Sequence, residues 1–126
     1  MTGQAERTSL RVLVVEDESL IAFELSDLLE DLGHRVVGMA AAPDQAVRLI
    51  HSLGGGLDAA MVDANLGGVS SAPVIDALRR GGIPFAVTSG YDEEELTALG
   101  VDGLQIVKPY NRDDVRQTLA KLARQS

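Results

Sequence analysis

Short runs of apolar residues alternate along the chain with longer segments in which apolar side chains recur every three or four positions. The short runs are rich in Val, Leu and Ala, which is the pattern of buried strands. The longer segments have the spacing of helices that bury one face. This alternation is typical of βα units stacked around a parallel sheet. Five units can be counted, with strands predicted at Leu10–Val15, Arg35–Met39, Leu57–Val62, Ile83–Thr88 and Leu104–Val107.

The first and last predicted helices carry clear boundary signals. Ser19 or Asp17 can cap the start of the first helix, and Gly33 supplies its stop. Asn111 and Asp114 stand three residues apart at the start of the last helix, as in a capping box. Apolar positions at helical spacing are expected to face the core, and they are Leu20, Ile21, Leu25, Leu28, Leu29 and Leu32 in the first helix and Val115, Leu119 and Leu122 in the last.

Three further helices are predicted between these two. Pro43 opens one that runs to Ile50. Ser70 or Ser71 caps the next, which stops at Gly81-Gly82. The residues expected to face inward are Val47 and Ile50 in the first of these helices and Val74, Ile75 and Leu78 in the second, and a short acidic helix is expected at Glu93–Leu99, capped by Asp92 and ended by Gly100.

Composition narrows the class of protein. The 126 residues are 45% hydrophobic, which is enough for one domain with a core of its own. A formal net charge of −8 argues against nucleic-acid binding, because phosphate recognition needs clustered Lys and Arg. Neither a secretory signal nor an apolar run long enough to cross a bilayer is visible. The chain has no Cys, which is compatible with the reducing cytoplasm where we expect it.

Acidic residues end two of the predicted strands. Asp63 follows the run Ala59-Ala60-Met61-Val62, and Glu16 and Asp17 follow Val12-Leu13-Val14-Val15. Because the carboxyl ends of parallel strands meet in one crevice, we expect these carboxylates to converge. Two carboxylates about 4 Å apart repel by roughly 4 kcal/mol at an effective dielectric of about 20. Since Mg²⁺ prefers carboxylate oxygens, the pattern predicts a Mg²⁺ site.

Two other strand ends supply groups suited to phosphoryl transfer. The fourth strand ends in Thr88-Ser89-Gly90, which offers hydroxyls and flexible backbone where a phosphoryl oxygen can bind. The fifth ends in Lys108-Pro109, whose ammonium can neutralise that oxygen and whose peptide bond is a candidate for the cis form. Once charge is neutralised in this way, a carboxylate such as Asp63 can act as the nucleophile that forms an acyl phosphate.

From Leu10 to the C-terminus the chain resembles the receiver domains of two-component response regulators. The matching motifs are Val15-Glu16-Asp17-Glu18, Val62-Asp63, Thr88-Ser89 and Lys108-Pro109. The resemblance implies a doubly wound, flavodoxin-like (βα)5 fold of the α/β class, with a five-stranded parallel sheet of order 2-1-3-4-5. It implies these roles: Asp63 as phosphoacceptor; Glu16, Asp17, Asp63 and the Asn65 main-chain carbonyl as Mg²⁺ ligands; Ser89 or Thr88 as the switch hydroxyl; and Lys108 as the phosphate contact.

One departure from the family pattern affects the expected switch. Receivers usually carry an aromatic residue three positions before the Lys, and here that position is Gln105. The segment from Pro84 to Tyr91 instead is similar to small stand-alone receivers with a Phe-Ala-Thr-Gly-x-Tyr-like motif. In that alignment Ser89 precedes the Gly and is the first choice for the switch hydroxyl, with Thr88 second. Tyr91 is the candidate replacement for the aromatic, and the expected partner-binding face comprises Tyr91, Gln105 and Tyr110.

The resulting prediction is a bacterial single-domain response regulator. It spans residues 1–126 as one receiver domain, with residues 1–8 as a disordered or loosely ordered tail and no room for an output domain after Arg124-Gln125-Ser126. A sensor histidine kinase or a histidine phosphotransfer protein donates the phosphoryl group, and a downstream protein reads the result, without nucleic acid or membrane. No catalysis is expected beyond the protein's own phosphorylation and dephosphorylation.

Two alternatives stay open from the sequence. Gln105 is compatible with a receiver-like binding module that works without phosphorylation. A small Mg²⁺-dependent phosphatase or phosphotransferase with Asp63 as nucleophile is the other alternative. It is disfavoured because Ala64-Asn65 follows Asp63, and a second Asp two residues on, which could act as acid and base, is missing.

Overall fold

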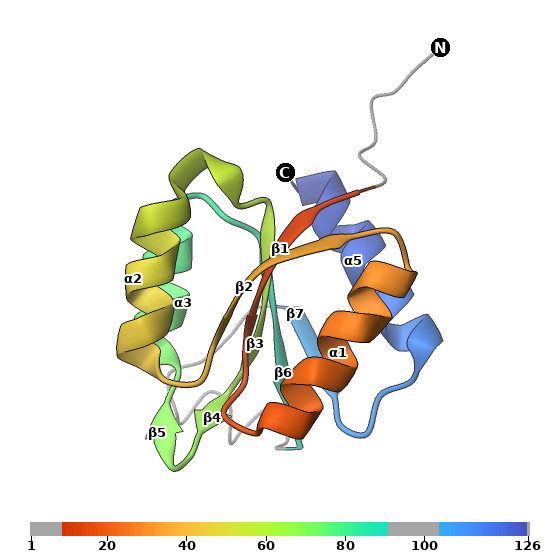
Figure 1. Cartoon of the computed structure of the whole chain (residues 1–126), viewed down its shortest axis with the longest axis horizontal. Helices are drawn as coiled ribbons and strands as arrows, with labels where there is room; N and C mark the ends of the chain where they lie inside the picture. Colours follow the sequence, from red (N-terminus) through yellow and green to blue (C-terminus); the bar gives the residue numbers. More distant parts are fainter. Residues whose placement is uncertain (1–8, 91–103, 126) are drawn as a thin grey trace.

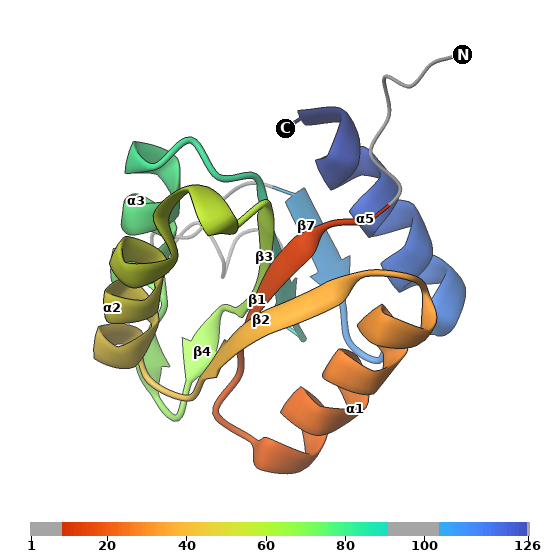
Figure 2. The same ribbon diagram turned by 45° about the horizontal axis from the view of Figure 1, so that its top comes forward.

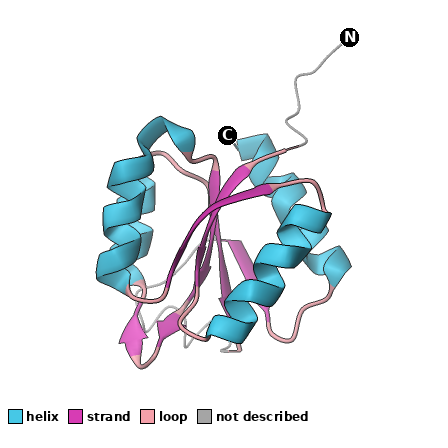
Figure 3. Ribbon diagram, in the orientation of Figure 1, coloured by secondary structure: helices cyan, strands magenta, loops and turns pink. Residues whose placement is uncertain are grey.

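The computed structural model describes residues 9–90 and 104–125, which form an α/β fold (Figures 1 and 3). The strands are β1 (Arg11–Val15), β2 (Arg35–Ala40), β3 (Ala59–Asp63), β4 (Asn65–Leu66), β5 (Val69–Ser70), β6 (Phe85–Ser89) and β7 (Leu104–Val107), and the helices are α1 (Ser19–Asp31), α2 (Pro43–Leu53), α3 (Ala72–Arg80) and α5 (Arg112–Gln125), with a short 3₁₀ helix η1 at Gly54–Gly56.

Five strands form one parallel sheet in the order β2-β1-β3-β6-β7. Here β6 and β7 are the fourth and fifth strands of the sequence prediction, so the expected order is confirmed. The strands β4 and β5 are additional and pair with each other in antiparallel fashion. The segment after Asp63 therefore forms a small two-stranded ribbon.

Helices cover both faces of the sheet, with α2 and α3 on one side and α1 and α5 on the other (Figures 1 and 2). Side chains of a strand point alternately to its two faces. Accordingly, Leu13 of β1 packs in the core under α2 and α3, whereas Val12 and Val14 pack in the core under α1 and α5. Such strands must be apolar on both faces, which is why they read as continuous apolar runs.

Local signals set several helix ends as predicted. Gly33 has φ of 97°, and its N–H and that of His34 donate to the carbonyls of Glu30 and Leu29, which ends α1 in a Schellman motif. At the start of α5 the Asn111 N–H donates to Asp114 Oδ2 at 3.0 Å, and the Asp114 N–H donates to Asn111 Oδ1 at 2.8 Å. The predicted capping box is therefore confirmed.

Other predictions at the helix starts were wrong. The residue that caps α1 is Glu18, rather than Ser19 or Asp17, and it makes no side-chain capping hydrogen bond. Asp17 is instead turned toward other carboxylates. Leu20, expected to face inward, is 71% exposed, because the buried stripe of α1 follows Ala22, Leu25 and Leu29 and Leu20 lies off it.

At the start of α3, the position and the hydrogen bond expected of one capping serine belong to two different serines. Ser71 occupies the capping position without a side-chain capping bond, while Ser70 Oγ accepts the N–H of Ala72 at 3.1 Å. The inward faces of α3 and α5 are as predicted, since Val74, Ile75 and Leu78 in α3 and Val115, Leu119 and Leu122 in α5 are all buried.

Several predictions lie outside the described residues. They are the tail at residues 1–8, Tyr91, and the acidic helix at Glu93–Leu99 with Asp92 and Gly100 at its ends. Among helices in the described ranges, not one has both the length and the apolar character that crossing a bilayer requires.

Candidate functional site

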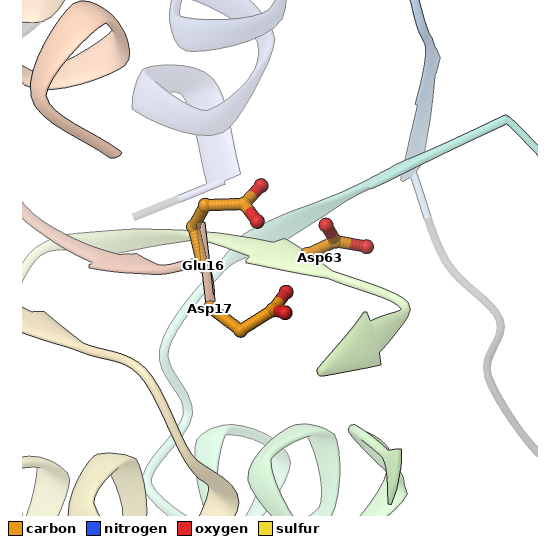
Figure 4. A group of neighbouring side chains, drawn as sticks. All are labelled: Glu16, Asp17 and Asp63. Carbon is orange, nitrogen blue, oxygen red and sulfur yellow. The ribbon is translucent and has the colours of Figure 1, made fainter. Parts of the chain in front are cut away.

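Three carboxylates gather at the carboxyl edge of the sheet. One carboxylate oxygen each of Glu16, Asp17 and Asp63 lies within 4.8 Å of the others. Glu16 and Asp63 are buried, and Asp17 is partly exposed. Figure 4 shows the three side chains turned toward a common space. The predicted convergence of these residues is thus present in the fold.

Strand pairing brings these residues together. The adjacent strands β1 and β3 pair in parallel with Val15 opposite Val62, so the residues that follow each strand emerge side by side. The Glu16 N–H donates to the carbonyl of Ala40 at 2.9 Å, which holds the chain beyond the end of β1 against β2. Two neighbouring parallel strands therefore place an acidic pair next to a single acid.

The ammonium of Lys108 bridges two of the carboxylates. Its Nζ donates to Asp63 Oδ2 at 2.8 Å and to Glu16 Oε1 at 3.2 Å. Lys108 directly follows β7, and its N–H donates to the carbonyl of Ser89 at 2.9 Å, so the ends of β6 and β7 are joined there. The Lys108–Pro109 peptide bond is cis, as suggested by the sequence.

The charges in the cluster alter two pKa values. The pKa of Glu16 is raised to about 7, chiefly by burial and in part by Asp63, although the Glu18 N–H and Lys108 act to lower it. For Lys108, burial by itself lowers the pKa, but the hydrogen bonds and attraction to Asp63 and Glu16 outweigh burial and leave it raised. Lys108 therefore stays charged, yet one ammonium does not compensate three acids.

Of the two candidate hydroxyls, Ser89 lies on the site. Both Thr88 and Ser89 are buried at the end of β6. Ser89 lines a hollow of about 270 Å³ together with Asp17, Asp63 and Asn65. Thr88 pairs with Asp63 in the sheet but is not among the residues that line this hollow.

Asn65 is held close to the carboxylate of Asp63. Its N–H donates to Asp63 Oδ1 at 3.0 Å, and its side-chain Oδ1 accepts the N–H of Gly68 at 2.6 Å. The side-chain oxygen of Asn65 thus binds the turn of its own ribbon, while its main-chain N–H contacts the Asp63 carboxylate.

The donor set fits a hard divalent cation. Carboxylate oxygens are the ligands that Mg²⁺ prefers, and the partial exposure of Asp17 leaves an open side where bound waters can remain. The positively charged ammonium of Lys108 lies between Glu16 and Asp63. Its position shows that the negative charge of these carboxylates favours a cation there.

Of the residues predicted for a partner-binding face, Gln105 and Tyr110 lie within the described part of the chain, and neither lines the hollow that contains Asp17 and Asp63. Gln105 lies in the edge strand β7, in a hollow shared with α5. Tyr110 is half-buried and lines a hollow of about 520 Å³ with Lys108, Pro109 and residues of α1. Burial raises the pKa of Tyr110. Gln105 and Tyr110 therefore line two different hollows.

Two features beside the site escaped the sequence analysis. Phe23 of α1 is 57% exposed and lines a hollow with Glu16, Asp17 and Met39. The sequence feature that could have pointed to Phe23 is its position off the buried stripe of α1. Gly67 lies next to the Asp17 carboxylate. The feature that could have pointed to Gly67 is the pair of glycines that follows Asp63 within five residues.

Comparisons with known proteins agree with this geometry. Residues 12–120 match the family described as Response regulator receiver domain. The chain is 31% identical over 112 residues to the phyllosphere-induced regulator PhyR of Methylorubrum extorquens, covering 87% of this chain and 42% of that protein. It is 32% identical over 123 residues to the two-component response regulator PhoP of Pseudomonas aeruginosa, covering 93% and 53%.

A solved structure gives a similar result over its whole length. The solution structure of SdrG from Sphingomonas melonis Fr1 superposes with a TM-score of 0.77 at 37% identity, covering 92% of this chain and 98% of that one. By contrast, the chain spans about half the length of the curated relatives PhyR and PhoP. Roughly half of each of those two proteins therefore has no counterpart in the matched region.

Proposed function

The chain belongs to the response regulator receiver domain family, and we propose that it accepts a phosphoryl group on Asp63 with Mg²⁺ and signals by protein contact. One observation carries the proposal. Three carboxylates, the ammonium of Lys108 and the hydroxyl of Ser89 meet at a single edge of the sheet. This is the set of groups that phosphoryl transfer to a carboxylate needs, namely a nucleophile and compensating charge.

In the proposed transfer, an oxygen of Asp63 forms a bond to phosphorus while the bond from phosphorus to the donor's imidazole nitrogen breaks. The nitrogen keeps the electron pair, and the imidazole leaves neutral because its other nitrogen carries the proton. Bound Mg²⁺ supplies positive charge for the phosphoryl oxygens. Glu16 and Asp17, with the main-chain carbonyl of Asn65, are the further residues that would hold it.

Lys108 and Ser89 are the groups expected to respond to the new charge. In the unmodified protein Lys108 bridges Asp63 and Glu16. A phosphoryl group on Asp63 offers stronger charge-assisted bonds to this ammonium and to the hydroxyl of Ser89. Thr88 is the second choice, because it does not line the hollow. The backbone bond between Lys108 and Ser89 couples the two responses.

These contacts can drive a switch if they favour one conformation strongly enough. A shift from one to ninety-nine per cent active needs about 5.5 kcal/mol of differential stabilisation. Several charge-assisted bonds at roughly 1.5–3 kcal/mol each supply that order of energy. The face proposed to change comprises Gln105 and Tyr110, together with Tyr91 beyond the described residues, and a downstream protein would read it.

The surroundings of the site favour a protein as phosphodonor. Two large apolar side chains of α1, Leu20 and Phe23, are 71% and 57% exposed, and Phe23 shares a hollow with Asp17. The helix α1 contains several acidic residues and no Lys, Arg or His. An apolar patch in an acidic rim fits a donor surface with apolar and basic side chains, such as a sensor histidine kinase or a histidine phosphotransfer protein.

A second candidate is a binding module that works without phosphorylation. Gln105 supports it, because a polar side chain stands where receivers usually carry the coupling aromatic. Under this alternative the partner would bind equally well with and without a phosphodonor, and Asp63 would stay unmodified.

Intact-mass measurement tests the proposed function. With a small phosphodonor and Mg²⁺ the protein should gain one phosphoryl group that hydroxylamine removes, since hydroxylamine cleaves acyl phosphates. EDTA and the substitution Asp63→Asn should each abolish the gain. Asp44→Asn, an exposed site on α2, is the control and should be modified as the wild type is. Persistent modification of Asp63→Asn would refute the assignment, and repeated turnover of a phosphomonoester would instead indicate a phosphatase.

A further inference from the structure

The ribbon formed by β4 and β5 begins two residues after the proposed phosphoacceptor. The two strands lie side by side in Figure 1. Asn65 pairs with Ser70 and Leu66 with Val69, and the turn between the strands is Gly67-Gly68. Both glycines have positive φ, 65° and 91°. This is the geometry of a type I′ hairpin turn, which L side chains adopt only with strain.

The two turn positions differ in what surrounds them. A Cβ atom added to Gly68 would meet nothing within 4 Å. A Cβ atom added to Gly67 would lie 3.5 Å from Asp17 Oδ2 and would meet no other described atom within 4 Å. Any side chain at position 67 would therefore be directed at the Asp17 carboxylate, whereas the same side chain at 68 would not.

Turn geometry alone does not explain a glycine at position 67. Type I′ turns accept Asn or Asp readily at the first central position, and Asn-Gly is the favoured pair. Gly67 also lines the hollow of about 270 Å³ that contains Asp17, Asp63 and Ser89. The absence of a side chain thus matters on the side of the turn that faces the site.

We propose that Gly67 is a positioning residue, which keeps the space beside Asp17 open so that this carboxylate and a hydrated cation fit together. The inference rests on the proposed Mg²⁺ site. Asp17 is the partly exposed member of the cluster, so it lies on the side where waters of a hydrated cation remain. Atoms beyond Cβ at position 67 would displace those waters or turn Asp17 away.

Magnesium titration by calorimetry tests the inference with matched variants. Gly67→Ala and Gly67→Leu bear the same backbone strain, because both place a Cβ atom at positive φ, but only Leu carries atoms beyond it. Gly68→Leu puts the same bulk on the open side of the turn. We expect Gly67→Leu to weaken Mg²⁺ binding at least about tenfold relative to Gly67→Ala, the range seen when groups that orient metal ligands are changed. Gly68→Leu should bind as the wild type does.

Thermal unfolding in EDTA checks that each variant is folded. Should Gly67→Leu fail to fold, Gly67→Asn takes its place, because Asn tolerates positive φ. Equal Mg²⁺ affinity of the bulky and Ala variants would overturn the role of Gly67 and leave the proposed function intact. A wild type that does not bind Mg²⁺, or whose binding is unaffected by Asp17→Asn, would overturn both.

Discussion

Lys108 is the residue that holds the acidic cluster together in the unmodified protein. Its ammonium lies 2.8 Å from Asp63 Oδ2 and 3.2 Å from Glu16 Oε1, and its side chain is 27% exposed. The attraction is therefore partly screened by water, but without the ammonium the carboxylates would face each other uncompensated. A cation bound at the site and the Lys108 ammonium would both reduce the repulsion among these carboxylates.

The substitution Lys108→Gln should make the protein more dependent on Mg²⁺. In EDTA we expect its Tm to fall by roughly 3–5 °C, corresponding to about 1 kcal/mol for a domain of this size. Added Mg²⁺ should raise the Tm of the variant more than that of the wild type, because it replaces the missing charge. Lys121→Gln, an exposed site on α5, is the control. An equal response of both proteins to Mg²⁺ would show that Lys108 and the cation are not linked.

His34 gives the fold a pH dependence of known sign. Its Nδ1 accepts the N–H of Leu10 at 3.1 Å, so the bonded form has no proton on that nitrogen. Burial lowers the pKa of His34 below its ordinary value. Between the folded and unfolded pKa values the unfolded chain binds more protons. Stability is therefore lost as the pH falls through about 6.5, the pKa of an unperturbed His.

Denaturant unfolding as a function of pH tests this contribution. The free energy of unfolding of the wild type should fall, relative to that of His34→Gln, as the pH is lowered through about 6.5. The free energies of unfolding of the two proteins are subtracted because Glu16, with its pKa raised to about 7, titrates in both. The subtraction removes its contribution. His51→Gln, an exposed change on α2, serves as control. A constant difference across the pH range would exclude the His34 contribution.

Some single residues were predictable and others were not. Asn111 and Asp114 were assigned correctly because a capping box is made by residues three apart, so nothing outside the segment decides it. Asp17 looked like a cap for the same local reason, but its carboxylate is turned toward Glu16 and Asp63, which arrive from tertiary structure. The local sequence does not decide whether Asp17 caps the helix or joins the carboxylate cluster.

At the scale of elements, α1 presents a face with a proposed role. Leu20 and Phe23 are exposed near the start of the helix, and Phe23 lines a hollow with Glu16 and Asp17. If a donor protein docks there, its rate of transfer depends on these side chains, whereas the chemistry at Asp63 does not. Interface aromatics are frequent sites of large energetic effect.

The variant Phe23→Ala should separate docking from chemistry. We expect the rate of phosphorylation by the donor protein to fall about tenfold, equivalent to about 1.4 kcal/mol, with the rate from a small phosphodonor unchanged. Radiolabel transfer and intact mass measure the two rates. Val69→Ala, on the exposed side of the ribbon, is a matched loss of an apolar side chain. If Phe23→Ala slowed phosphorylation by the protein donor and by the small phosphodonor equally, Phe23 would affect the chemistry at Asp63 and not docking.

The main strands and helices were predictable, but the ribbon was not. Strands β1 and β3 are apolar on both faces, and helices α3 and α5 have regular stripes, so their patterns are unmistakable. The strands β4 and β5 have two residues each, which is too short for an alternation to be recognised. Gly67-Gly68 was the sole hint, since paired glycines are frequent in hairpin turns.

For the whole molecule, the decisive property is that a parallel sheet collects strand ends at one edge. That rule alone predicts that Asp17 and Asp63, 46 positions apart (63 − 17), come together, and they do. The strand order came from the family resemblance, because apolar patterning does not specify which strands are neighbours. The bridge from Lys108 to Glu16 depends on side-chain positions within the site, which neither the sequence pattern nor the strand order specifies.

The residue that carries the phosphoryl group is the central claim, and borohydride can identify it. Borohydride reduces an acyl phosphate to an alcohol, so a phosphorylated Asp becomes homoserine and can be located by peptide mass spectrometry. After treatment with a phosphodonor and Mg²⁺, we predict homoserine at position 63 and at no other acidic position. Homoserine at Asp17 or another Asp, or 2-amino-5-hydroxypentanoic acid (the alcohol formed from a phosphorylated Glu) at Glu16 or another Glu, would contradict the central claim. So would a protein that has gained the mass of a phosphoryl group but contains neither alcohol after reduction.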